Sequence, residues 1–183
     1  MALTPSTMLP LGTIAPQFKL PDTEGHLLGL DDFPQAQGFL VMFISNHCPY
    51  VKHLKEHLAA TTAKYMKQGI AVFAINSNDV KNYPEDSPEK MKKDKAQFHY
   101  PFPYLFDETQ EVAKAYQAAC TPDFFLFDRN KKLIYRGQYD DSRPGNRKPI
   151  TGQNLIAAME AALKNQSILE EQIPSIGCNI KWK

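Results

Sequence analysis

The sequence predicts a single α/β domain with a central mixed β-sheet flanked by helices, and three observations carry this prediction. A chain of 183 residues that is 43% hydrophobic and 11% aromatic can bury one sizeable core. The two apolar runs at 39–44 and 70–76 are typical of strands buried on both faces. Helical spacing of apolar residues from Pro49 to about Lys67 connects them, which predicts a βαβ unit with parallel strands and a right-handed crossover.

The segments before this unit are less regular. Residues 1–14 are expected to form an irregular leader. From Ala15 onward the pattern of residues 18–28 predicts two short strands around an Asp/Gly turn, an N-terminal β-hairpin that extends the domain.

The chain after the βαβ unit alternates short elements with turns. The pattern predicts a polar loop from Ser77, a helix over 88–98, a strand over 102–106 and a brief helix that Thr109 caps. A β-hairpin of residues 123–137 follows.

A last helix capped by Thr151 completes the expected domain, which therefore spans residues 15–163. Residues 164–183 form a tail, in which Ile180 and Trp182 are unusual for a free end. We expect this tail to dock on the domain and to bury the aromatic side chain.

The charge balance excludes several classes of partner. Lysine and arginine number 21 against 20 acidic residues, and no dense basic patch occurs, so neither nucleic acid nor an anionic membrane is expected as a partner. The first residues lack the features of a signal peptide and no apolar run reaches 18 residues, which predicts a cytoplasmic protein.

Cofactor and metal signatures are also missing from the sequence, which holds no phosphate loop, dinucleotide fingerprint or serine-nucleophile elbow. His53 and His57 share a helix face with i,i+4 spacing, and with Cys48 they suggest a metal site. No further Cys/His pair stands in sequence to complete a tetrahedron, so we expect exposed histidines, no metal and no cofactor.

Cys48 is the residue most clearly placed for chemistry. The strand at 39–44 ends in a polar turn that contains Ser45 and His47, and Pro49 follows Cys48 at a first helical position. Unpaired N–H groups and the positive end of the helix dipole meet there and favour thiolate over thiol. We therefore predict a nucleophilic Cys48 rather than an inert buried thiol, with His47 either relaying a proton or serving as a partly exposed turn residue.

A lone thiolate that attacks a disulfide or a peroxide needs a second thiol to return it to its resting state. The chain has three cysteines, and the other two are Cys120 and Cys178. Cys120 lies two residues before Pro122, while Cys178 lies in the tail after Gly177. Both are candidates to resolve Cys48, and for each the alternative is a small buried side chain.

Several segments together resemble the thioredoxin superfamily, and more narrowly its redoxin branch of TlpA-type thiol-disulfide oxidoreductases and AhpC/TSA-like peroxiredoxins. They are Ala15 to Asp22, Tyr104 to Asp107, the Cys48 helix start and Thr121-Pro122. The resemblance covers about residues 15–163 and implies a thioredoxin-like fold. It places Thr121-Pro122 at the family's cis-proline, beside the active cysteine. It also implies that Pro49, Tyr50, Thr121 and Pro122 hold a substrate chain in an extended pose.

Two departures from the family pattern bear on the reaction. Val51 stands where thioredoxins carry the second cysteine of Cys-x-x-Cys. Ser45 stands at the Thr/Ser position of peroxiredoxins, but Val41 replaces their proline, and Arg136 does not fall on the family's arginine.

We therefore predict a thiol-disulfide oxidoreductase, monomeric or homodimeric, that acts on protein or small-molecule thiols and disulfides through the single nucleophile Cys48. One alternative is a thiol peroxidase in which Ser45 and backbone N–H groups orient the peroxide. The other is a thioredoxin-fold binding or chaperone module with weak or no turnover.

Overall fold

The computed structural model describes residues 3–183, and its centre is a five-stranded mixed sheet with the order β6-β5-β4-β8-β9. The strands are β4 (Gly38–Phe43), β5 (Ile70–Asn76), β6 (Tyr104–Phe106), β8 (Asp123–Asp128) and β9 (Leu133–Gly137). Strands β4, β5 and β6 are mutually parallel, whereas β8 and β9 run antiparallel to their neighbours. The predicted βαβ unit and the predicted C-terminal hairpin are both present.

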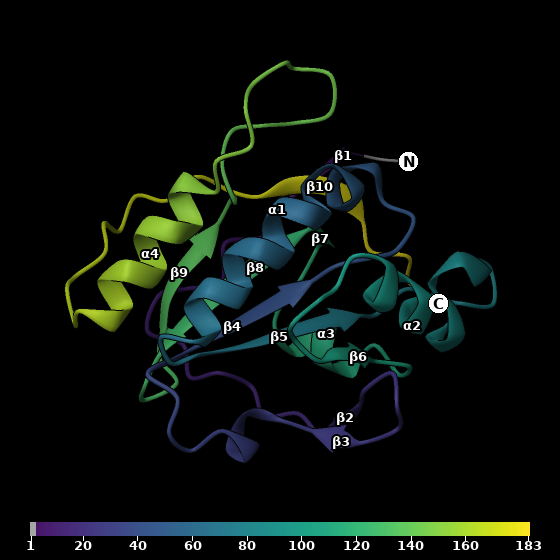
Figure 1. Ribbon diagram of the computed structural model, residues 1–183, viewed down its shortest axis with the longest axis horizontal. Helices are drawn as coiled ribbons and strands as arrows, with labels where there is room; N and C mark the ends of the chain where they lie inside the picture. The colour runs from purple at the N-terminus through teal and green to yellow at the C-terminus, as the bar shows by residue number, and fades with distance from the viewer. Residues whose placement is uncertain (1–2) are drawn as a thin grey trace.

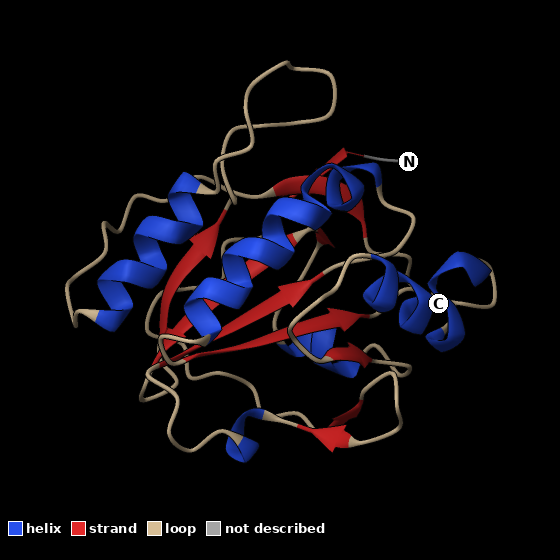
Figure 2. Ribbon diagram, in the orientation of Figure 1, coloured by secondary structure: helices blue, strands red, loops and turns tan. Residues whose placement is uncertain are grey.

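Helices cover both faces of this sheet, as Figures 1 and 2 show. Helices α1 (Pro49–Met66) and α4 (Gln153–Leu163) lie together on one face, α3 (Glu111–Ala115) lies on the other, and α2 (Pro88–Gln97) follows β5. Strand β4 is buried along its whole length and its side chains alternate between two cores. Leu40 and Met42 pack toward α1 and α4, while Val41 and Phe43 pack with α3 and the N-terminal segment.

Two small sheets flank the central one. Strands β2 (Leu20–Pro21) and β3 (Leu27–Leu28) form the predicted N-terminal hairpin, and the 3-10 helix η1 (Leu30–Asp32) follows it. The other sheet has the order β1-β10-β7, made of β1 (Leu3–Pro5), β10 (Ile176–Asn179) and β7 (Cys120–Thr121), all antiparallel. Residues 1–14 are therefore not wholly irregular, because the distant tail supplies a partner strand for Leu3–Pro5.

The tail docks through a different residue from the one expected. Ile180 is 1% exposed and its N–H donates to the carbonyl of Ala119 at 3.0 Å, whereas Trp182 is 43% exposed. The predicted burial of the tryptophan is wrong. The peptide groups and Ile180 fasten the tail, so an aromatic anchor is not needed.

Two helix starts differ by one residue from the predicted caps. Gln110 and Gly152, both with left-handed φ, occupy the N-cap positions of α3 and α4. The hydroxyls of Thr109 and Thr151 still accept hydrogen bonds from backbone N–H groups two residues later.

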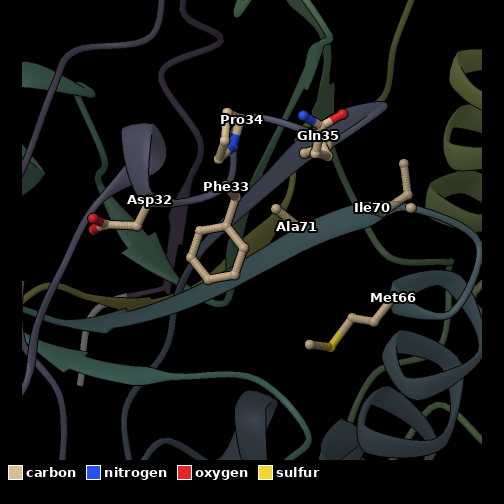
Figure 3. A pocket seen from close by; sticks show the side chains of 9 residues that line it. Asp32, Phe33, Pro34, Gln35, Met66, Ile70 and Ala71 are labelled. Carbon is tan, nitrogen blue, oxygen red and sulfur yellow. The ribbon is translucent and has the colours of Figure 1, made fainter.

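A pocket of about 400 Å³ opens where β5 begins and α1 ends (Figure 3). Its wall includes Phe33, Met66 and Ile70. Cys48 follows the other end of the parallel strands, so this pocket is remote from the cysteines. Within residues 3–183, no helix is both long and apolar enough to cross a membrane.

Candidate active site

Cys48 is the N-cap residue of α1, directly after the turn that leaves β4. Its backbone is extended (φ −65°, ψ 122°) and Pro49 occupies the first helical position. Its N–H donates to the hydroxyl of Ser45 at 3.3 Å. The local sequence accounts for this geometry, because the proline lacks the N–H that would be unpaired at this position. The side chain is 1% exposed.

The sulfur of Cys48 lies 2.9 Å from that of Cys178, although 130 residues separate the two in sequence. The carbonyl oxygen of Thr121 lies 3.1 Å from the same Cys48 sulfur. Both cysteines are free thiols and both are buried. Burial and the adjacent Cys48 sulfur raise the pKa of Cys178 to about 12, so Cys178 remains a thiol at neutral pH.

Strand β10 brings Cys178 to this position by pairing with β7. Cys178 is opposite Thr121 and Asn179 is opposite Cys120 in the antiparallel register. A Cβ atom on Gly177 would lie 1.9 Å from the carbonyl oxygen of Thr121, so glycine is required for the strands to approach this closely.

This pairing involves the proline loop, whose role in substrate binding stays a prediction. The Thr121-Pro122 bond is cis, as the resemblance implied, and it lies beside Cys48. The backbone edge at Thr121, which we expected to bind a substrate chain, pairs instead with the chain's own tail. Sequence reasoning missed this because strand pairing between distant segments leaves no local signal. Tyr50 is half-buried and borders a small hollow with Pro122.

Asp86 fixes the turn before Cys48 and was not singled out from the sequence. It ends the 3-10 helix η2 (Pro84–Asp86), is fully buried, and lies 2.7 Å from Nδ1 of His47. It also accepts hydrogen bonds from the Asn46 N–H and the Asn78 side chain, each at 2.7 Å. Burial alone would raise the pKa of Asp86, but the bonds from His47 and Asn78 hold it below its usual range.

His47 therefore has more contacts than a simple turn residue. Its ring also stacks on Tyr83, with centroids 5.6 Å apart and 7° between the planes. The carboxylate and the tyrosine together fix the orientation of the imidazole that precedes the cysteine. The hydroxyl of Ser45 lies 3.3 Å from both Asp86 Oδ2 and His47 Nδ1, so it belongs to the same network.

Comparison with known families identifies the family to which this chain belongs. The model of the AhpC/TSA family matches residues 11–136, which is more than half of the chain. This chain belongs to the AhpC/TSA family. The match confirms the resemblance to redoxins.

Known relatives of this AhpC/TSA chain agree with the prediction of an oxidoreductase. The thiol-disulfide oxidoreductase ResA of Geobacillus kaustophilus is 29% identical over 130 residues, which cover 71% of this chain and 70% of ResA. A crystal structure of an uncharacterized conserved protein from the same organism is 53% identical with a TM-score of 0.97, covering 100% of this chain and 97% of the other.

A third comparison bears on the fold alone. The thioredoxin domain of a thiol-disulfide oxidoreductase from Bacteroides vulgatus has a TM-score of 0.60 at 20% identity, covering 74% of this chain and 90% of the other. The predicted thioredoxin-like fold is confirmed.

Cys120 has different surroundings in this AhpC/TSA chain. Its sulfur lies 3.6 Å from the carbonyl oxygen of Pro122 and 4.0 Å from that of Ser175. Neighbouring residues of a strand point to opposite faces, so Cys120 and Thr121 do not share a face, whereas Cys178 lies on the face of Thr121. Burial and the nearby Asp123 raise the pKa of Cys120 far above its usual range.

Asp123, directly after the cis-proline, is a second carboxylate that the sequence did not reveal. It is completely buried, and its Oδ1 has no hydrogen-bond partner among the described residues. Burial raises its pKa to about 7, despite bonds from Ser6 and from backbone N–H groups such as that of Ala119.

The remaining candidate functional residues, Arg136, His53 and His57, have hydrogen-bond partners other than the three cysteines. Arg136 donates through Nε to the carbonyl of Leu9 at 2.9 Å and through a terminal nitrogen to Gln172 at 3.0 Å. His53 and His57 are half-buried rather than exposed, because they contact Ser142 and the Tyr139 hydroxyl, each at 2.7 Å. No group of three potential metal ligands occurs in residues 3–183.

Proposed function

We propose that this protein is a thiol-disulfide oxidoreductase whose redox couple consists of Cys48 and Cys178. The observation that carries the proposal is the distance of 2.9 Å between their sulfur atoms. A disulfide bond needs about 2.05 Å, so the sulfurs have only about 0.9 Å to travel. Strand β10 supplies the second thiol that Val51 does not provide in the helix.

The reaction follows from the different environments of the two thiols. Cys48, at the helix start, attacks one sulfur of a disulfide and forms a mixed disulfide, and the released thiolate takes up a proton. Cys178 then loses its proton and attacks the sulfur of Cys48, which releases the second thiol. One disulfide is thus reduced to two thiols while the Cys48–Cys178 disulfide forms, and the reverse sequence oxidises two thiols.

The residues around the couple support its geometry. Asp86 holds both the His47 ring and the Asn46 N–H, which fixes the turn that presents Cys48. Relatives named thiol-disulfide oxidoreductase support the same reaction class. The cytoplasmic location and the monomeric or dimeric state stay predictions.

Peptide mapping under non-reducing conditions tests the proposal. Reduced protein is treated with one equivalent of a small disulfide and, in a second arm, with hydrogen peroxide. We expect a Cys48–Cys178 link in the wild type and in Cys120→Ser, and none in Cys48→Ser. With Cys178→Ser we expect a mixed disulfide trapped on Cys48. Failure of Cys48 to react with any disulfide, or pairing with Cys120 instead, contradicts the proposal.

A thiol peroxidase is the second candidate, and membership of the AhpC/TSA family supports it. Peroxide would oxidise the Cys48 thiolate to a sulfenic acid, and Cys178 would condense with it and release water. The guanidinium of Arg136 already donates to Leu9 and Gln172, which makes it less available to an anionic transition state. We therefore expect the peroxide arm to be slower than the disulfide arm.

A further inference from the structure

A pocket of about 460 Å³ adjoins the residue that precedes Cys48. Asn46 and His47 of the active-site turn form one side of it, Lys52 and Lys55 of α1 a second, and α2 with its C-terminal Phe98 the third. Lys52 lies one helical turn after Cys48, to whose carbonyl its own N–H donates at 2.9 Å. The volume suits a small molecule, and the lining includes the residue directly before the proposed nucleophile but not Cys48 itself.

Basic side chains dominate the charge of this pocket. Four lysines line it against two acidic residues; they are Lys52, Lys55, Lys90 and Lys93 against Glu85 and Asp94. Lys55 is buried and pairs with Asp94, and Lys93 pairs with Glu89 outside the pocket. Among residues 3–183, Lys52 and Lys90 have no ion pair, and Lys52 is close enough to repel the charge of Lys55. An anion bound there would find two ammonium groups that have no ion pair within the described residues, against the single carboxylate of Glu85 that has none either.

The tail determines whether a substrate chain can pair with the backbone beside Cys48. Strand β10 occupies the backbone edge at Thr121, and β1 covers its other edge, so both edges of the tail strand are paired. An extended polypeptide cannot pair with Thr121 unless the tail leaves. A small molecule can enter the pocket beside His47 without pairing with any strand, because most of the side chains that line the pocket are exposed or half-buried.

We propose that this cationic pocket binds the carboxylates of small anionic disulfides and thiols, and so selects them as substrates of the Cys48–Cys178 couple. The inference rests on the proposed function. Lys52 and Lys90 are the residues that set the preference, because neither forms an ion pair among the described residues and both line the pocket. Lys55 holds the turn instead, through Nζ and the carbonyl oxygen of Asn46 at 3.2 Å.

Three small dialkyl disulfides of different charge test the proposal. Dithiodipropionate carries two negative charges, 2-hydroxyethyl disulfide none and cystamine two positive charges. The second-order rate constant for oxidation of the reduced protein is measured by thiol alkylation, and each value is divided by that for 2-mercaptoethanol with the same disulfide. Each disulfide can react only when the buried Cys48 becomes accessible. This step is the same for all three disulfides, so its contribution cancels when their normalised rate constants are compared.

We expect the dianion to react at least about fivefold faster than the dication, since each exposed ion pair contributes a factor of about two or more. Lys52→Gln with Lys90→Gln should abolish most of this preference, as should high salt. The control variant Lys67→Gln with Lys164→Gln removes two exposed lysines that are remote from the pocket. It should retain the preference for the dianion.

The possible outcomes separate the two proposals. Equal rates for the three disulfides, a preference for cystamine, or a preference that survives in Lys52→Gln with Lys90→Gln overturns the charge selection but leaves the disulfide reaction standing. If none of the three disulfides oxidises the wild-type protein, the proposed function itself fails, and the substrate inference fails with it.

Discussion

Replacing Gly177 with alanine tests whether the approach of β10 to β7 creates the redox couple. The new Cβ would lie 1.9 Å from the Thr121 carbonyl oxygen, and real Cβ contacts essentially never fall below 3.0 Å. The two strands must therefore separate by at least about 1.1 Å, which disturbs the pairing of Cys178 with Thr121. Because a disulfide forms only at specific geometry, this shift acts directly on the two sulfurs.

The magnitude has two parts. Overpacking at a well-packed site costs about 1–3 kcal/mol, and a weakened backbone hydrogen bond costs about 1 kcal/mol. We expect Gly177→Ala to lower the free energy of unfolding of the reduced protein by about 2–4 kcal/mol in urea titrations. Formation of the Cys48–Cys178 disulfide should slow by about tenfold or more, because proximity is the main contribution to its rate.

Alkylation of Cys48 with iodoacetamide supplies a second readout. Displacement of β10 exposes this thiol, so its alkylation should accelerate in the Gly177→Ala variant. Gly145→Ala is the control, because Gly145 has a left-handed φ of 84° but no atom within 4 Å of the added Cβ. It should lose stability without changing either thiol reaction. If Gly177→Ala forms the disulfide as fast as the wild type, the close approach of the two strands is not what positions Cys178.

Three further predictions follow from the buried carboxylates and from the couple. Asp123→Asn should stabilise the protein above pH 7 by up to about 4 kcal/mol but not near pH 4. The pKa of Asp123 is about 7 in the folded protein against 3.8 for a free carboxyl, so the wild type loses stability as the pH rises between these values. Urea titrations at several pH values measure the difference. Asp86→Asn should cost about 2 kcal/mol at pH 7 and progressively less as pH falls through the lowered pKa of Asp86, with loss of the His47 contact visible in imidazole NMR shifts. Oxidation that links Cys48 and Cys178 closes a loop of about 130 residues and should raise stability to urea by up to about 5 kcal/mol, and an oxidised form no more stable than the reduced one would contradict the proposed pairing.

The parts of the fold that were predictable are those whose signals are contiguous in sequence. The apolar strand β4, the polar turn and the Cys-Pro helix start are neighbours, so their periodicity and capping chemistry placed Cys48 correctly. The same holds for the βαβ unit and the hairpin of β8 and β9.

The parts that were missed depend on contacts between distant segments. The sequence left Cys120 and Cys178 as equal candidates, and only the register of β10 against β7 places Cys178 beside Cys48. Asp86 looked like one acidic residue in a polar loop, because nothing local shows that its carboxylate is buried under His47. The leader strand β1 was missed for the same reason, since its partner lies at the other end of the chain.

The placement of the second thiol on a strand has a consequence that a Cys-x-x-Cys helix does not share. In that motif both sulfurs belong to one helical turn, so their separation is nearly independent of the rest of the fold. Here the separation depends on the position of strand β10. Gly177 allows β10 to approach β7 closely, and the N–H of Ile180 donates to the Ala119 carbonyl. Any change that loosens β10 should therefore expose Cys48 and move Cys178 away from it at the same time. A substitution that weakens the pairing of β10 should therefore lower the free energy of unfolding of the reduced protein and also slow formation of the Cys48–Cys178 disulfide.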